Sequence, residues 1–260
     1  MPSNTNNRII YYHSIGEKDL LSIKNSLFYD QMKWLKVNGF RTCFLDEFIK
    51  EPNKNNNNNK IIAITFDDGY EDNYTDAYPI LREFNLKATV FVVSNFIGKV
   101  SKVKSMLYPN RRMLTEEQII EMSNNLIEFG SHTSNHKNIG KVLRNEDVIF
   151  REEIYHSKRI IEKIINKKIY SFSYPFGQFN CFNELSKTNL IEAGYSCAVT
   201  TLPRRKLHWS KYELPRVEIS VDDNIESFKN KILGKYEVLH DIRSKIYRKN
   251  WRELGYENRH

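Results

Sequence analysis

The stretch 62-IAITFDDGYED-72 begins as an apolar, β-branched strand and ends in two adjacent aspartates, a glycine and further acid. Two neighbouring carboxylates repel each other, and burying either one without a partner costs several kcal/mol. In parallel α/β folds, functional groups collect at the carboxyl ends of strands. Asp67 and Asp68 are therefore candidate site residues that need a positive partner, unless Asp68-Gly69 is only turn chemistry.

Similar apolar, β-branched or aromatic runs recur on both sides of this strand. They are 8-RIIYY-12, 87-KATVFVV-93, 169-IYSFSY-174, 195-YSCAVTT-201 and 212-YELPRVEI-219. Segments with helical spacing lie between them, including a stripe closed by Gly39 and formed by Leu27, Phe28, Met32, Leu35 and Val37. Thr115 and Gln118 stand at capping-box spacing. Strands that alternate with helices predict an α/β fold with a mainly parallel sheet, closed or open.

Length and composition indicate one sizeable soluble domain. The chain has 260 residues, of which 40% are hydrophobic, and no apolar run approaches the roughly 18 residues of a membrane span. The first 15 residues lack the basic and apolar regions of a secretory signal. The three cysteines, Cys43, Cys181 and Cys197, are widely spaced, which argues against a disulfide framework or a cysteine-based zinc site. We therefore expect a reducing, cytoplasmic setting.

The basic excess is concentrated at the end of the chain. Residues 229–260 contain nine Lys or Arg against four Asp or Glu, a net of +5 out of the total formal charge of +8. No nucleic-acid motif accompanies this surplus, so we expect no nucleic-acid partner. Residues 235–260 are predicted to form a basic amphipathic helical tail. It either docks on the domain with a solvated basic face or contacts an anionic membrane surface peripherally.

A second chemical motif is 131-SHTSNH-136, which follows the apolar run 126-LIEF-129. His132 and His136 are four residues apart, so one helical turn or a compact loop can aim both imidazoles at one point. Two histidines with one aspartate form a hydrolytic zinc arrangement that leaves a position for water or substrate. One of the paired aspartates would then bind the cation and the other would handle a proton. The alternative is a pair of surface histidines.

A third motif, 173-SYPFG-177, ends another apolar run. Pro175 removes one backbone donor and restrains the chain, so the Phe176 N–H can point into a site as an oxyanion donor. The alternative is an ordinary turn.

These three motifs, in this order, resemble those of the polysaccharide deacetylases of the NodB-homology type, carbohydrate esterases that remove acetyl groups from sugars. The matching segments are 65-TFDDG-69, 132-HTSNH-136 and, in a variant form, 173-SYPFG-177. The resemblance runs from about Tyr12 to Ile219 and implies a distorted (β/α) barrel over residues 1–234. It also implies a divalent metal, usually zinc, and an N-acetylated glycan substrate. It makes Asp67 the catalytic base and Asp68, His132 and His136 the metal ligands.

The chain departs from the family pattern at three places. Ser173 stands where the third motif usually begins with an arginine that orients the base. The late Leu-x-His that supplies the general acid is absent, as is the fourth motif with its Asp and Trp. Arg216, in 214-LPRVEI-219, resembles the arginine that members with a YPFG-type third motif carry there, and it could orient Asp67. A surface arginine is the alternative.

His13, which ends the first predicted strand, is our candidate for the missing general acid. It would lie at the barrel mouth, and histidine has the pKa best suited to proton donation near neutrality. A structural histidine is the alternative, and His208 is the next candidate.

The expected activity is a metal-dependent hydrolysis that releases acetyl groups from N-acetylated sugars of a glycan or glycoconjugate. Two rivals have other signatures. A related amide hydrolase or deformylase would release a different product, and a glycan-binding barrel without turnover would be expected to lack Asp67 or a metal ligand. All four of those residues are present.

Overall fold

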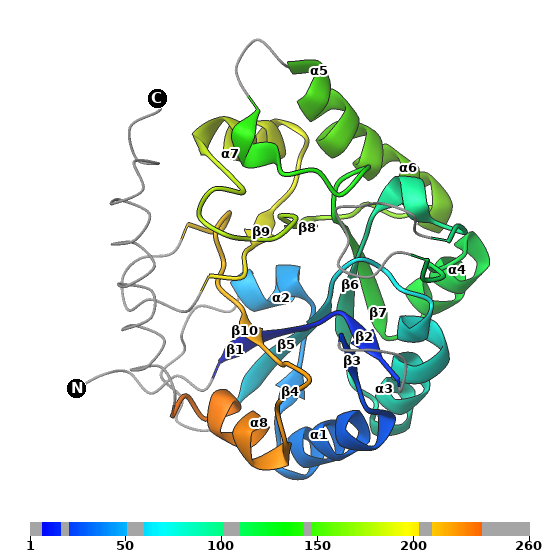
Figure 1. Cartoon of the computed structure of the whole chain (residues 1–260), viewed down its shortest axis with the longest axis vertical. Coiled ribbons are helices and arrows are strands. Elements are labelled where there is room, and N and C mark those ends of the chain that lie inside the picture. Colours follow the sequence, from blue (N-terminus) through cyan, green and yellow to red (C-terminus); the bar gives the residue numbers. More distant parts are fainter. Residues whose placement is uncertain are drawn as a thin grey trace.

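Eight parallel strands form one curved sheet in the computed structural model, which describes residues 7–16, 21–50, 60–100, 110–142, 147–202 and 210–235 (Figure 1). The strands are β1 (Arg8–Tyr12), β4 (Arg41–Thr42), β5 (Ile61–Phe66), β6 (Ala88–Val92), β7 (Ile127–Ser131), β8 (Ser171–Ser173), β9 (Cys197–Val199) and β10 (Val217–Glu218). Their order is β10-β1-β5-β6-β7-β8-β9, and β4 pairs with β5 off this path. The predicted parallel α/β fold is confirmed.

The segment that leads into β10 links the two edges of this sheet. The Leu214 N–H donates to the Ala198 carbonyl at 2.9 Å, and the Thr200 N–H donates to the Leu214 carbonyl at 2.8 Å, so this segment runs beside β9. The chain then continues into β10, which pairs with β1. The curved sheet is thus a distorted barrel, as expected, and Arg216 lies where the chain passes from one edge to the other.

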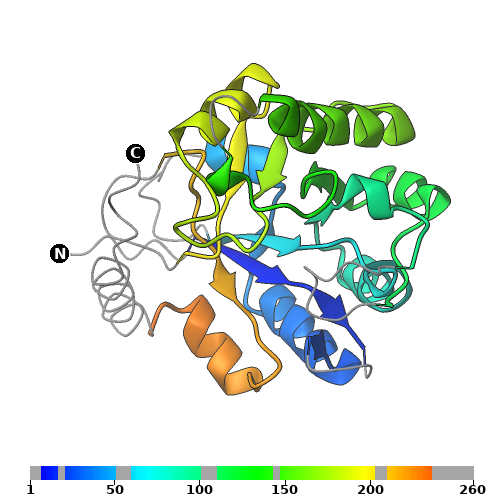
Figure 2. The same cartoon turned by 45° about the horizontal axis from the view of Figure 1, so that its top comes forward.

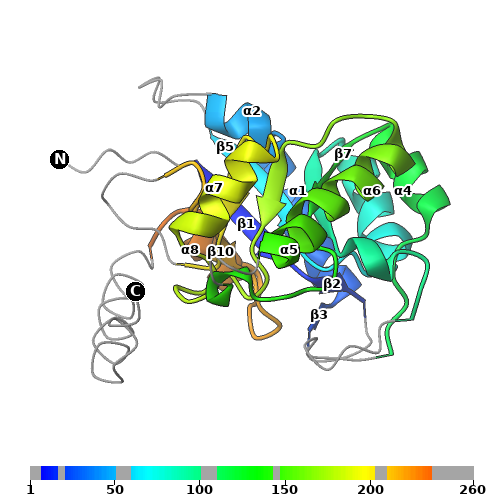
Figure 3. The same ribbon diagram turned by 90° about the horizontal axis from the view of Figure 1, so that it is seen from above.

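Helix α2 (Leu45–Lys50) packs on residues inside the barrel, and the other helices cover the outer side of the sheet (Figures 2 and 3). These outer helices are α1 (Asn25–Val37), α3 (Tyr78–Phe84), α4 (Glu116–Ser123), α5 (Asp147–Phe150), α6 (Ser157–Ile165), α7 (Glu184–Glu192) and α8 (Ile225–Ile232). The main core fills the layer between the strands and these helices. Thr115 and Gln118 form the capping box of α4, as predicted. Among the described helices, none is long and apolar enough to cross a bilayer.

Helix α1 confirms most of its predicted stripe and corrects one residue. Phe28, Met32 and Leu35 are buried, and Gly39 follows the helix with φ +74°. Val37 is 76% exposed, contrary to the expectation. Two residues beyond Leu35, it has turned through about 200° of a 3.6-residue helix and faces solvent.

The inside of the barrel is filled by apolar side chains. A second apolar cluster there combines the strand residues Ile9, Ala63, Phe91, Cys197 and Val199 with Leu45, and it includes Phe48 and Ile49 of α2 as partly buried members. Gly130 makes room for Phe91, because a Cβ at this glycine would lie 2.6 Å from the Phe91 ring. Apolar packing thus fills the interior, and the polar groups of the site follow the carboxyl ends of β5, β7 and β8.

Candidate active site

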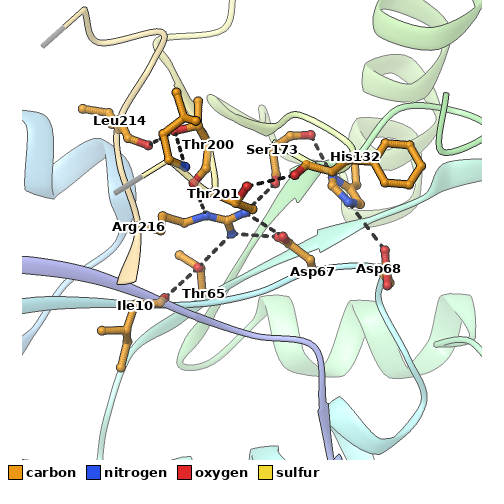
Figure 4. Close-up of polar contacts among 12 residues, drawn as sticks. Ile10, Thr65, Asp67, Asp68, His132, Ser173, Thr200, Thr201, Leu214 and Arg216 are labelled. Carbon is orange, nitrogen blue, oxygen red and sulfur yellow. Dashed lines mark hydrogen bonds and ion pairs between the residues drawn. The ribbon is translucent and has the colours of Figure 1, made fainter. Parts of the chain in front are cut away.

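The paired aspartates follow β5 directly, and the backbone between them aims their side chains at different partners (Figure 4). Both are buried, with 2% of Asp67 and 6% of Asp68 exposed. Asp68 has φ +73° and Gly69 has φ +75°. A side chain at position 69 would also collide with Val92, whose Cγ1 lies 2.7 Å from an ideal Cβ there. This left-handed turn separates two adjacent carboxylates that would otherwise repel each other.

Arg216 holds Asp67 from the other edge of the barrel (Figure 4). Its Nη1 and Nη2 donate to the two Asp67 oxygens at 2.8 and 2.6 Å. The remaining donors reach the Thr200 carbonyl, the Thr65 hydroxyl and the Ser173 hydroxyl, each at 3.1 Å. Ser173, which stands where the family usually has an arginine, therefore accepts a hydrogen bond from an arginine that comes from elsewhere in the chain. The surface-arginine alternative is wrong, because Arg216 is 2% exposed.

The ion pair keeps Asp67 ionised. Burial acts to raise the pKa of Asp67, but the Arg216 guanidinium holds it below its ordinary value. A carboxylate with this pKa is ionised throughout the neutral range.

The two histidines lie on a loop after β7, so the compact-loop interpretation of their spacing holds. Thr133 and His136 have φ values of +67° and +57°, which are not helical. The His132 Nδ1 lies 2.8 Å from the Ser173 carbonyl oxygen. Since a carbonyl can only accept, Nδ1 carries the proton and Nε2 presents a lone pair toward Asp68.

Asp68, His132 and His136 form a cluster that can hold a metal ion, since one ligand atom from each lies within 4.8 Å of the others. Asp68 Oδ1 lies 3.5 Å from the His132 Nε2 and 3.4 Å from the His136 Nε2. These distances are long for direct hydrogen bonds, and Oδ1 is buried without a hydrogen-bond partner among the described residues. Burial lowers the pKa of His136 to about 4, so its imidazole is neutral at pH 7. The donor set therefore fits a divalent cation.

Phe176 and His13 border this cluster. The Phe176 ring is 44% exposed and packs 4.8 Å, centroid to centroid, from the His136 ring. Its backbone has φ +65°, a strained value for phenylalanine. His13 lies on the same side of β1 as Tyr11, whose ring is 5.7 Å away. His13 also lies within electrostatic range of both Asp67 and His136.

The sequence interpretation missed one polar residue at the site. The hydroxyl of Tyr70 is fully buried, has no hydrogen-bond partner among the described residues and lies beside Asp68. Burial, followed by the Asp68 charge, raises its pKa far above the ordinary value, so it remains a hydrogen-bond donor. Its position directly after Asp67, Asp68 and Gly69 was the available signal.

A family model described as polysaccharide deacetylase matches residues 54–198. The chain belongs to the polysaccharide deacetylase family. The protein is thus assigned to the deacetylase hydrolases, and the Asp-His-His group matches the metal dependence of these enzymes. This assignment rests on more than half of the chain.

Two relatives and two solved structures are similar to this deacetylase over most of its chain. YxkH of Bacillus subtilis, whose name describes it as a polysaccharide deacetylase, is 32% identical over 82% of this chain and 71% of its own length. A poly-β-1,6-N-acetyl-D-glucosamine N-deacetylase of Staphylococcus aureus is 26% identical over 84% of this chain and 74% of its own length. A polysaccharide deacetylase from Bacillus cereus has a TM-score of 0.71 at 25% identity, covering 87% of this chain and 68% of that one. IcaB from Ammonifex degensii has a TM-score of 0.72 at 20% identity, covering 87% and 95%, and shows the fold alone.

Proposed function

We propose that this deacetylase removes acetyl groups from N-acetylated sugars of a glycan or glycoconjugate. The observation that carries the proposal is the separation of two carboxylates into two environments. Asp67 is paired with Arg216 and holds no place in the histidine cluster, whereas Asp68 faces both histidines. One acid is available for proton transfer and the other for a cation.

Asp68, His132 and His136 would hold the cation, and two imidazoles with one carboxylate suit zinc. When bound, a divalent metal supplies Lewis-acid chemistry toward an amide carbonyl and favours deprotonation of water. The buried Tyr70 hydroxyl lies beside Asp68 and is a donor available at that ligand.

The other residues act on protons and on developing charge. Asp67 takes a proton from the attacking water, and Arg216 keeps its carboxylate ionised and oriented. The Phe176 N–H donates to the oxyanion of the tetrahedral intermediate. His13 donates a proton to the sugar nitrogen, because an amine leaves poorly unless it is protonated.

The relative from Staphylococcus aureus suggests the substrate class. That protein is named for poly-β-1,6-N-acetyl-D-glucosamine. We propose that an N-acetylglucosamine unit within a larger glycan is also the substrate here.

An acetate-release assay with zinc across N-acetylated glycans tests the proposal. We expect acetate and a free sugar amine in equal amounts, and loss of turnover on chelation. Release of formate or ammonia would identify the rival amide hydrolase instead. Glycan binding without any product would indicate the inactive barrel.

A further inference from the structure

The loop that carries His132 and His136 is held from two sides. On one side, the residues that follow β6 donate to it: the Ser94 N–H binds the Thr133 carbonyl at 3.2 Å, and the Asn95 N–H binds the Ser134 carbonyl at 3.1 Å. The other side is the π-helical turn η5 (Arg151–His156), which leads into α6. The catalytic scheme proposed above uses no residue of this turn.

Glu153 makes the contact from η5. Its Oε2 accepts from the Asn135 N–H at 2.8 Å, and its Oε1 accepts from the Asn135 Nδ2 at 2.8 Å. Its own carbonyl accepts from the Ser134 N–H at 3.2 Å. Glu153 therefore binds the two residues that immediately precede His136.

The burial of Glu153 makes this contact specific. Its side chain is fully buried, and a buried carboxylate is costly unless hydrogen bonds compensate for the lost water. The Lys137 Nζ lies 3.7 Å from Oε1, but the lysine side chain is 57% exposed and its charge is screened by solvent. The stabilisation thus comes mainly from the two short bonds to Asn135. The Asn135 Oδ1 also accepts from the Asn95 Nδ2 at 2.9 Å, so one side chain connects both supports of the loop.

The π-helical turn contributes to this arrangement. Such turns are rare, and they occur frequently at functional sites because they displace side chains from the regular helical path. Here the turn places Glu153 under the loop between the two histidines.

We infer that Glu153 is a positioning residue that sets His136, through Asn135, for metal binding. The inference rests on the proposed metal role of Asp68, His132 and His136. Partners in the second layer of a metal site typically contribute about 10–100-fold to affinity, because they orient the ligands before the metal arrives.

Glu153→Gln is the direct test. Glutamine keeps the size of the side chain but replaces one carboxylate oxygen with an amide NH2, which would face an N–H donor of Asn135. Glu152→Gln, the same substitution at the neighbouring exposed side chain, is the matched control. Zinc affinity is measured by competition with a chelating dye, and the absorption spectrum is recorded at saturating cobalt(II). We expect Glu153→Gln to bind zinc about 10–100-fold more weakly and to change the cobalt spectrum, while Glu152→Gln matches wild type.

The cobalt spectrum separates positioning from support of the fold, because it reports ligand geometry in protein that is folded and fully loaded. If Glu153→Gln does not fold, Asn135→Ala, at a half-buried loop position, replaces it in the zinc and cobalt measurements. If Glu153 acts through Asn135, the losses of zinc affinity in the two single variants will not add in the double variant. Folded variants with wild-type zinc affinity and wild-type cobalt spectrum would overturn the inference. Failure of the wild-type protein to bind zinc would instead overturn the proposed function.

Discussion

At the scale of single residues, the candidate site depends on two adjacent aspartates with different electrostatic surroundings. Asp67 has a full positive charge within hydrogen-bond distance, whereas Asp68 Oδ1 faces two histidine nitrogens and has no hydrogen bond. The left-handed backbone at Asp68 and Gly69 creates this difference by turning the chain directly after Asp67. Chemically similar substitutions at the two positions should therefore have different consequences.

We expect Asp67→Asn to retain metal while losing about 10²–10⁴-fold in turnover, the usual contribution of a general base. Asp68→Asn and His132→Ala should instead lower metal occupancy, because each removes a proposed ligand. Elemental analysis and acetate release on the purified variants check both expectations, with thermal unfolding as a control for folding. Equal metal loss in the two aspartate variants would contradict the division of roles.

His13→Ala should retain metal and stability but lose most acetamide turnover. The physical reason is that the amine leaving group needs a proton, whereas the leaving group of an activated ester does not. The loss measured on an activated acetate ester should therefore be much smaller. Wild-type turnover of the acetamide by His13→Ala would refute the assignment and direct attention to His208, which lies outside the described residues.

At the scale of elements, several strands contribute apolar residues to the interior of the barrel, while the polar groups of the site follow the carboxyl ends of β5, β7 and β8. Glu128 on β7 is an exception, because it is an acid low in the barrel beside α2. Burial raises its pKa to about 7, and the charge of Asp46 adds to the effect. Thr89 donates to it at 3.2 Å. Asp46 is itself paired with Lys50, and Glu47 with Lys87.

Glu128 should make the metal-free protein less stable as the pH rises from about 4.5 to 7. Across this range the folded protein keeps a proton that the unfolded chain, with an ordinary pKa of 4.5, has lost. The difference in unfolding free energy between wild type and Glu128→Gln should therefore fall by roughly 3 kcal/mol. Denaturant unfolding of both proteins at a series of pH values, in the presence of a chelator, measures this difference in unfolding free energy.

The wild type must be compared with Glu128→Gln, because His136 changes the unfolding free energy with pH in the opposite direction. Its pKa is lowered from 6.5 to about 4, so its contribution to stability grows as the pH rises between those values. Glu116→Gln, at an exposed position on α4, is the matched control and should run parallel to wild type. A difference curve for Glu128→Gln that does not change with pH would show that this acid is not protonated in the fold.

At the scale of the whole molecule, the site assembles where the barrel closes. Arg216 reaches Asp67 after β5, Ser173 at the end of β8 and Thr200 after β9. Its guanidinium also lies over the ring of Tyr11 on β1, 4.5 Å from the centroid. One buried arginine thus joins four strands around the proposed base.

The basic tail proposed from residues 235–260 lies almost entirely outside the described residues. We propose that it holds the enzyme at an anionic membrane, because basic residues alternate with apolar ones along this segment. Sedimentation with liposomes should show binding that requires anionic lipid, weakens with salt and disappears on truncation after Lys235. Binding that does not respond to these three changes would remove the proposal and favour a helix docked on the barrel.

The sequence alone was sufficient for features that depend on neighbouring residues. Apolar, β-branched or aromatic runs indicated the long strands, the capping box marked the start of α4, and the aspartate and histidine motifs indicated the proposed base and ligands. Two-residue strands such as β2 (Ser14–Ile15), β3 (Ser22–Ile23) and β4 were missed because so short a segment carries no periodicity.

Tertiary structure alone decided how distant segments meet. Arg216 was named as a candidate partner of Asp67, but a surface position stayed open as the alternative until the barrel brought together two residues 149 positions apart. Glu153, Tyr70 and the Ser173 hydroxyl acquired their roles in the same way. The physical reason is that a local pattern determines which way a side chain points along its own strand or helix. Its partner across the barrel depends on strand order, closure and packing, which no short stretch of the chain specifies.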